Sequence, residues 1–123
     1  MKITKITPDE ITFDDGSVLI SHHDQDCCER VYADFENMQI ATDIGRNSIK
    51  SEELDFFENV LESIVPIYGL GFYLVSKQGY CIMVSCYDEQ KGYYSSELEL
   101  IHRQNGKIHQ KDISRCTFTI RED

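Results

Sequence analysis

The residues best suited to chemistry lie in one short run, His22-His23-Asp24-Gln25-Asp26-Cys27-Cys28-Glu29. Imidazole and thiolate are ligands that zinc prefers, and a carboxylate can supply a further donor. The candidate metal ligands in the run are His23, Asp26, Cys27, Cys28 and Glu29. One short run seldom wraps four ligands around an ion, so a complete site needs donors from elsewhere. The remaining histidines and cysteines are His102, His109, Cys81, Cys86 and Cys116.

Two other roles compete with metal binding in this run. A catalytic thiol needs a nearby base or a positive field that lowers the pKa of the cysteine. Either histidine could supply the base, but Asp24, Asp26 and Glu29 surround the thiols with negative charge, which raises a thiol pKa. The structural alternative is that the cysteines pack as small hydrophobic residues and the aspartates bond backbone amides in turns. The sequence slightly favours this structural role.

A second group of residues suits recognition rather than catalysis. Gly92-Tyr93-Tyr94-Ser95 follows Tyr87 closely. Tyrosines near a turn offer a large contact area at a low entropy cost, so Tyr87, Tyr93 and Tyr94 are candidates for a partner-binding surface. The alternative is that they cover the rim of the core, as aromatic residues in strands commonly do.

The acidic charge of the chain is unevenly distributed. The net charge is −10; residues 1–62 contain 15 acidic and 5 basic residues, whereas residues 63–123 contain 7 of each. An acidic surface repels phosphate backbones, which disfavours direct nucleic-acid binding and favours a basic protein partner. The same excess also fits an acidic mimic of nucleic acid, or simply a soluble surface.

Length and cysteine content place further limits on the protein class. A chain of 123 residues fits a single domain, residues 1–123, with its own core. The cysteine count is odd, no CxxC pair occurs, and no apolar run reaches signal-peptide or membrane-spanning length. We therefore expect a cytoplasmic protein without disulfides and without membrane contact. Common nucleotide, metalloprotease and hydrolase motifs are absent from the sequence.

The His-Cys run must be positioned by the strands that precede it. Asp15-Gly16 stands between two apolar runs, which is a strong hairpin pattern. The strand that begins at Val18 leads directly into the run. The remaining assignments in this half are strands at about 2–7 and 10–14, a strand within the ambiguous segment 27–38, and a loop over 39–50.

One helix is predicted, over residues 51–65. Ser51 is a suitable N-cap, and acidic residues follow it in the first turn. Leu54, Phe57 and Leu61 begin an apolar stripe at helical spacing that continues to Ile64 and Val65. Because Pro66 disfavours helix at the preceding residue, the helix should end there.

The second half of the sequence is typical of β-structure. Residues 71–76 and 80–87 are apolar and aromatic runs joined by a turn, and Leu98 and Leu100 alternate with glutamates. Asn105-Gly106 predicts another hairpin, and Cys116, Phe118 and Ile120 are expected on one face of a last strand. The expected fold class is therefore α+β, a mainly antiparallel sheet with one principal helix, about 51–65, packed on it.

Two segments resemble a small family of uncharacterised bacterial and phage proteins, a domain of unknown function. The first comprises Asp15-Gly16-Ser17, an H-x-Q-D-C-C-E box from His23 to Glu29, and then Val31-Tyr32. The second comprises Gly79-Tyr80 through Tyr87 and then a G-Y-Y-S box from Gly92 to Ser95. The chain departs from the family pattern at Asp88 to Lys91, where members tend to have a turn of shorter side chains. The resemblance implies no activity. It implies that His23 is the matched histidine and that the two boxes belong together, which we expect on one edge of the sheet.

The sequence therefore favours a small, non-enzymatic cytoplasmic protein that binds or regulates a partner. The acidic half would attract a basic protein, and the tyrosines would provide contact area. The first alternative is a zinc-type metal site or a thiol site at the His-Asp-Cys-Cys-Glu box, with zinc as the one cofactor it suggests. The second alternative is the acidic nucleic-acid mimic.

Overall fold

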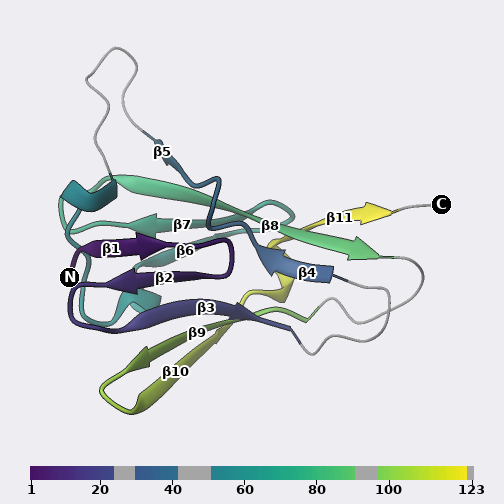
Figure 1. Cartoon of the computed structure of the whole chain (residues 1–123). Coiled ribbons are helices and arrows are strands. Elements are labelled where there is room, and N and C mark those ends of the chain that lie inside the picture. The colour runs from purple at the N-terminus through teal and green to yellow at the C-terminus, as the bar shows by residue number, and fades with distance from the viewer. Residues whose placement is uncertain (24–29, 42–50, 91–96, 122–123) are drawn as a thin grey trace.

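The computed structural model describes residues 1–23, 30–41, 51–90 and 97–121, and these form two β-sheets (Figure 1). The first sheet is antiparallel and has five strands in the order β1-β2-β3-β9-β10. Its strands are β1 (Ile3–Ile6), β2 (Glu10–Phe13), β3 (Val18–His22), β9 (Glu99–Gln104) and β10 (Lys107–Asp112).

The second sheet has six strands and is organised around one long strand, β8 (Cys81–Gln90). The path β11-β8-β7-β6 is joined by β4 and β5, which both pair with β8; the pairing of β11 with β8 is parallel. The other strands are β4 (Arg30–Ala33), β5 (Gln39–Ala41), β6 (Ile64–Ile67), β7 (Gly71–Val75) and β11 (Thr117–Arg121).

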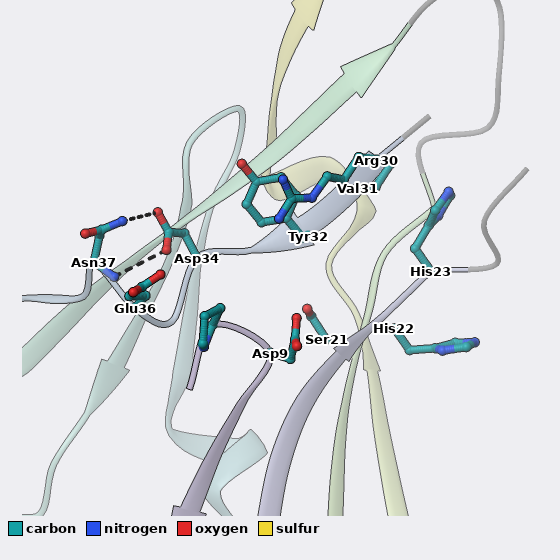
Figure 2. A pocket seen from close by; sticks show the side chains of 11 residues that line it. Asp9, Ser21, His22, His23, Arg30, Val31, Tyr32, Asp34, Glu36 and Asn37 are labelled. Carbon is teal, nitrogen blue, oxygen red and sulfur yellow. Dashed lines mark hydrogen bonds between the residues drawn. The ribbon is translucent and has the colours of Figure 1, made fainter. Parts of the chain in front are cut away.

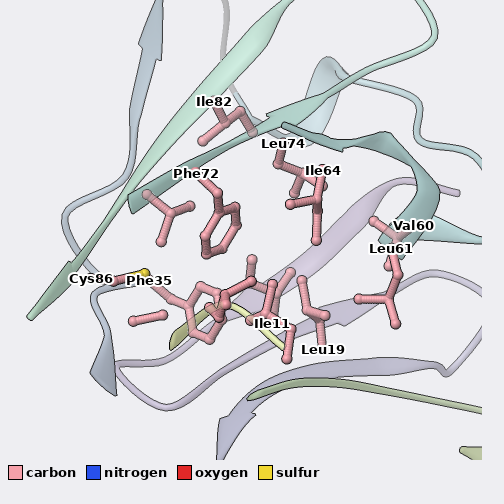
Figure 3. Packing of buried hydrophobic residues seen from close by; sticks show 14 of the residues in the cluster. Ile11, Leu19, Phe35, Val60, Leu61, Ile64, Phe72, Leu74, Ile82 and Cys86 are labelled. Carbon is pink, nitrogen blue, oxygen red and sulfur yellow. The ribbon is translucent and has the colours of Figure 1, made fainter. Parts of the chain in front are cut away.

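The two sheets enclose one hydrophobic core (Figure 3). Ile11, Leu19 and Leu100 project from the five-stranded sheet, and Phe72 and Ile82 project from the six-stranded sheet. All five side chains are completely buried. Burial of aliphatic and aromatic side chains stabilises a fold by about 1.5–3 kcal/mol each, so this shared core holds the sheets together.

Both predicted hairpins are present. The turn at Asp15-Gly16 joins β2 to β3, with Gly16 at a φ of 84°, and the turn at Asn105-Gly106 joins β9 to β10. Asn105 and Gly106 have φ values of 50° and 74°. Two consecutive residues with positive φ match the twist of a two-residue hairpin, which is why Asn-Gly is favoured there.

The predicted principal helix over 51–65 is wrong, and with it the α+β class. The described residues contain three short 3₁₀ helices, η1 (Ser51–Glu53), η2 (Val60–Ser63) and η3 (Ser114–Cys116), and strand β6 begins at Ile64. Phe57 and Val65, which the helical stripe would bury, are 48% and 50% exposed. The fold of the described residues is mostly antiparallel β-structure.

The backbone groups that a helix would use are bonded elsewhere. The Phe56 N–H donates to the Met1 carbonyl at 2.6 Å, and the Asp55 carbonyl accepts from the Lys77 N–H at 2.7 Å. The Asp55 carboxylate also accepts from the Met1 ammonium at 2.7 Å. Because these contacts fix the chain in an extended form, tertiary bonds override the local helical pattern.

Two smaller assignments also change. Residues 39–41 form β5 rather than loop, and the rest of the predicted loop, 42–50, lies outside the described residues. Cys116 is buried in η3, whereas Phe118 and Ile120 are exposed on β11, so the three do not share a face. The described part of the chain contains no helix with the length and apolarity that a membrane crossing requires.

Candidate functional site

Most of the predicted site residues lie outside the described part of the chain. These are Asp26, Cys27, Cys28 and Glu29 of the first box, and Tyr93 and Tyr94 of the second. His23 and Tyr87 are described: His23 directly follows β3 of the five-stranded sheet, and Tyr87 lies on β8 of the six-stranded sheet. Among the residues that are described, no group of three or more His, Cys, Asp or Glu side chains could hold a metal ion.

His23 follows the end of β3 and contacts the chain near the second box. Its Nδ1 lies in hydrogen-bonding contact with the backbone oxygen of Glu97, which is two residues beyond the G-Y-Y-S box. The expectation that the two boxes lie together stays a prediction, because every other residue of both boxes is outside the described ranges.

Two of the described cysteines, Cys86 and Cys116, are poorly suited to thiol chemistry. Cys81, Cys86 and Cys116 are free, and the last two are buried. Burial raises the pKa of both buried thiols, and for Cys86 the neighbouring Cys116 adds to the effect. Both therefore remain protonated at neutral pH and pack as small apolar groups.

A polar cleft of about 390 Å³ lies where the two sheets approach each other (Figure 2). The β1–β2 turn and the end of β3 form one wall, and β4 with the residues after it forms the other. Three carboxylates and one guanidinium line the cleft, so the net charge of these lining side chains is negative. The lining residues used below are Asp9, Asp34 and Glu36, with Arg30 and Tyr32.

The walls of the cleft are fixed by hydrogen bonds. Asp34 accepts from the side-chain amide of Asn37 at 2.9 Å, and the Ala33 N–H donates to Ser21 Oγ at 3.3 Å. The second bond ties β4 to β3 and so joins the two sheets at the cleft. A preorganised wall reduces the entropy cost of binding a partner.

Tyr87 lies in the centre of an aromatic row on the outer face of the six-stranded sheet. Along β8, residues 82, 84, 86 and 88 are buried, so the alternate residues, including Tyr87, face outward. Strand register places Tyr32 of β4 on one side of Tyr87 and Phe118 of β11 on the other. The Tyr32 and Tyr87 ring centroids are 5.7 Å apart, and Phe118 is 51% exposed.

The tyrosines of this row are held by polar neighbours. The Arg30 guanidinium lies 4.2 Å from the centroid of the Tyr32 ring, a cation–π contact. The Tyr32 hydroxyl donates to the Glu89 carboxylate at 3.3 Å. Burial and the charge of Glu89 raise the pKa of Tyr32, which keeps this hydroxyl protonated as a donor. Tyr32 belongs to both the row and the cleft, and Arg30 lines the cleft while it stacks on the Tyr32 ring, so the two features form one surface.

The sequence identified Tyr87 but not its neighbours. Tyr32 and Phe118 stand 55 residues before and 31 residues after it, and only the register of β8 brings the three together. Alternation within each strand indicates which residues share a face, but not which strands pair.

Comparison with protein-family models, with curated proteins and with solved structures finds no match to this chain.

Proposed function

We propose that this chain is a non-enzymatic binding protein whose contact surface is the aromatic row Tyr32–Tyr87–Phe118 with the acidic cleft beside it. The observation that carries the proposal is the row itself, three aromatic rings on one outward sheet face, with an arginine stacked on one of them. Tyrosine and arginine supply much of the binding energy of protein interfaces. We also propose a cytoplasmic location, which agrees with the free thiols of the described cysteines.

The proposed partner is a basic protein segment. The cleft is lined by three acidic residues, Asp9, Asp34 and Glu36, and by the basic residue Arg30. A fourth acidic residue, Glu89, adjoins the row. A lysine or arginine side chain entering the cleft would face these carboxylates, while apolar residues beside it would cover the rings. Such electrostatic complementarity supports specificity and fast association.

Selection from a random peptide display library, with the folded chain as bait, tests the proposal. We expect enriched peptides that combine lysine or arginine with apolar or aromatic residues, and weaker binding at higher salt. Enrichment of acidic peptides, or of none, would contradict the proposal.

The variant Tyr87→Ala should weaken binding of an enriched peptide about thirtyfold, the loss expected of a central interface aromatic. The matched control is Tyr68→Ala, because Tyr68 lies in the turn between β6 and β7, outside the row, and is 74% exposed. The affinity of Tyr68→Ala for the peptide should match that of the unchanged chain. Equal losses for the two variants would show that the row is not the binding surface.

A further inference from the structure

Three edge strands of this fold carry a feature that discourages further strand pairing. An edge strand exposes unpaired backbone groups, and proteins protect such edges with lysine, proline, charge or cover. The β10 edge has Lys107 and Lys111, and the β6 edge has Pro66. The β4 edge begins with Arg30 and is tied to β3 through Ser21 Oγ.

The β11 edge lacks this protection. Within the described residues β11 pairs only with β8, and it lies near the C-terminus with its far side open (Figure 1). Its sequence, Thr117-Phe118-Thr119-Ile120-Arg121, consists of strong strand formers followed by one charged residue. Phe118 and Ile120 are 51% and 36% exposed. Such a strand is a template for pairing with another strand.

We propose that two copies of this chain pair antiparallel through β11 and form a symmetric dimer. With the two-fold axis at Thr119, Phe118 of one copy lies opposite Ile120 of the other on the same face. Arg121, the charged residue of the strand, lies opposite Thr117, so no like charges meet directly. The edge is therefore complementary to itself, which is what a two-fold interface requires.

The dimer would also extend the aromatic row. The dimer proposal does not depend on the role proposed for the row in partner binding. Phe118 adjoins Tyr87 within its own copy, and Ile120 adjoins Glu89. In the dimer, the row of one copy therefore continues into Ile120 and Glu89 of the second copy. Each chain carries a net charge of −10, so association is opposed by repulsion and should strengthen as salt screens it. Binding of a basic segment should weaken with salt, so failures of the two proposals can be told apart.

Sedimentation equilibrium of the full chain tests the dimer. We expect the mass to rise with concentration from the chain mass of 14.3 kDa toward twice that value, at concentrations below about 1 mM and more readily at higher salt. Phe118→Lys and Thr119→Lys should keep the monomer mass throughout. Ile108→Lys makes the same charge change at a similarly exposed position of the protected β10 edge. This variant should dimerise more readily than Phe118→Lys or Thr119→Lys.

Oxidative cross-linking gives a second test that does not depend on a disrupted interface. Directly opposed residues of antiparallel strands have Cα atoms about 4.5–5.5 Å apart, which suits a disulfide. Thr119→Cys should therefore give at least tenfold more cross-linked dimer than Ile108→Cys or the unchanged chain. A wild-type monomer at every concentration, cross-linking no greater than in the controls, open-ended polymers, or a dimer unaffected by both β11 lysines would overturn the proposal.

Discussion

His102 is a buried polar residue whose ring packs against other aromatic rings. It is completely buried on β9, and neither ring nitrogen has a hydrogen-bond partner among the residues that the structure describes. Its ring meets Phe13 edge-on at 6.1 Å and lies 6.5 Å from the His109 ring, centroid to centroid. Burial lowers the pKa of His102, and His109 acts in the same direction, whereas Asp15 opposes the shift. The imidazole is therefore neutral in the folded chain near pH 7.

This lowered pKa predicts acid sensitivity. The unfolded chain binds the proton near the ordinary pKa of 6.5, but the folded chain binds it only at lower pH. The free energy of unfolding should therefore fall as pH falls below about 6.5, because protonation favours the unfolded state. Urea denaturation at a series of pH values measures this slope. His102→Leu should flatten the slope, whereas His109→Gln should leave most of it, because burial is the larger cause of the lowered pKa. A retained slope in His102→Leu would contradict the assignment.

Gly71 lies at a close approach of β7 to β8. A Cβ built there would lie 1.9 Å from the Val84 carbonyl oxygen and 2.9 Å from the Ser85 Cα. Gly71→Ala should therefore lower the free energy of unfolding by about 3 kcal/mol, since backbone atoms must move. At Gly79 the φ is +88°, and no described atom other than those of its chain neighbours lies within 4 Å of a Cβ built there. Gly79→Ala should therefore cost about 1 kcal/mol through backbone strain alone. Equal losses in a denaturation titration would show that the close approach has no effect.

At the scale of elements, β8 is the strand on which the six-stranded sheet depends. It pairs with β7 and β11 along one edge and with β4 and β5 along the other. Backbone amides of a strand that is paired on both edges and packed on the core exchange their hydrogens only when the fold opens. Hydrogen exchange should therefore be slowest in β8 and β7, and faster in the edge strand β10, whose residues are mostly exposed. Comparable protection in β10 would contradict this hierarchy.

The elements that could be predicted from the sequence are those fixed by neighbouring residues. Asp15-Gly16 and Asn105-Gly106 determine their hairpins through backbone conformations that these residues adopt easily. The segment 51–65 has a helical pattern, but Met1, some 55 residues away in the sequence, bonds to the Phe56 backbone and to the Asp55 carboxylate. Likewise, the sequence pattern singles out Tyr87 as a candidate, whereas the parallel pairing that brings Phe118 beside it depends on the chain's last described strand.

At the scale of the whole molecule, charge and aromatic surface occupy connected regions. The net negative charge arises from residues 1–62, and Asp9, Asp34 and Glu36 from that half line the cleft. The rings beside the cleft come from both halves of the chain, because β8 and β11 belong to the second. A basic ligand would thus be attracted by one half of the chain and held by side chains of both.

The central claim, that the row and cleft are the binding surface, is tested most directly by mapping amide chemical shifts. The probe is the most enriched display peptide, titrated into isotope-labelled protein. The predicted result is that shift changes concentrate in β4, in the second half of β8 and in β11. Changes confined to the five-stranded sheet, centred on β10 and the outer face of β9, would contradict the account.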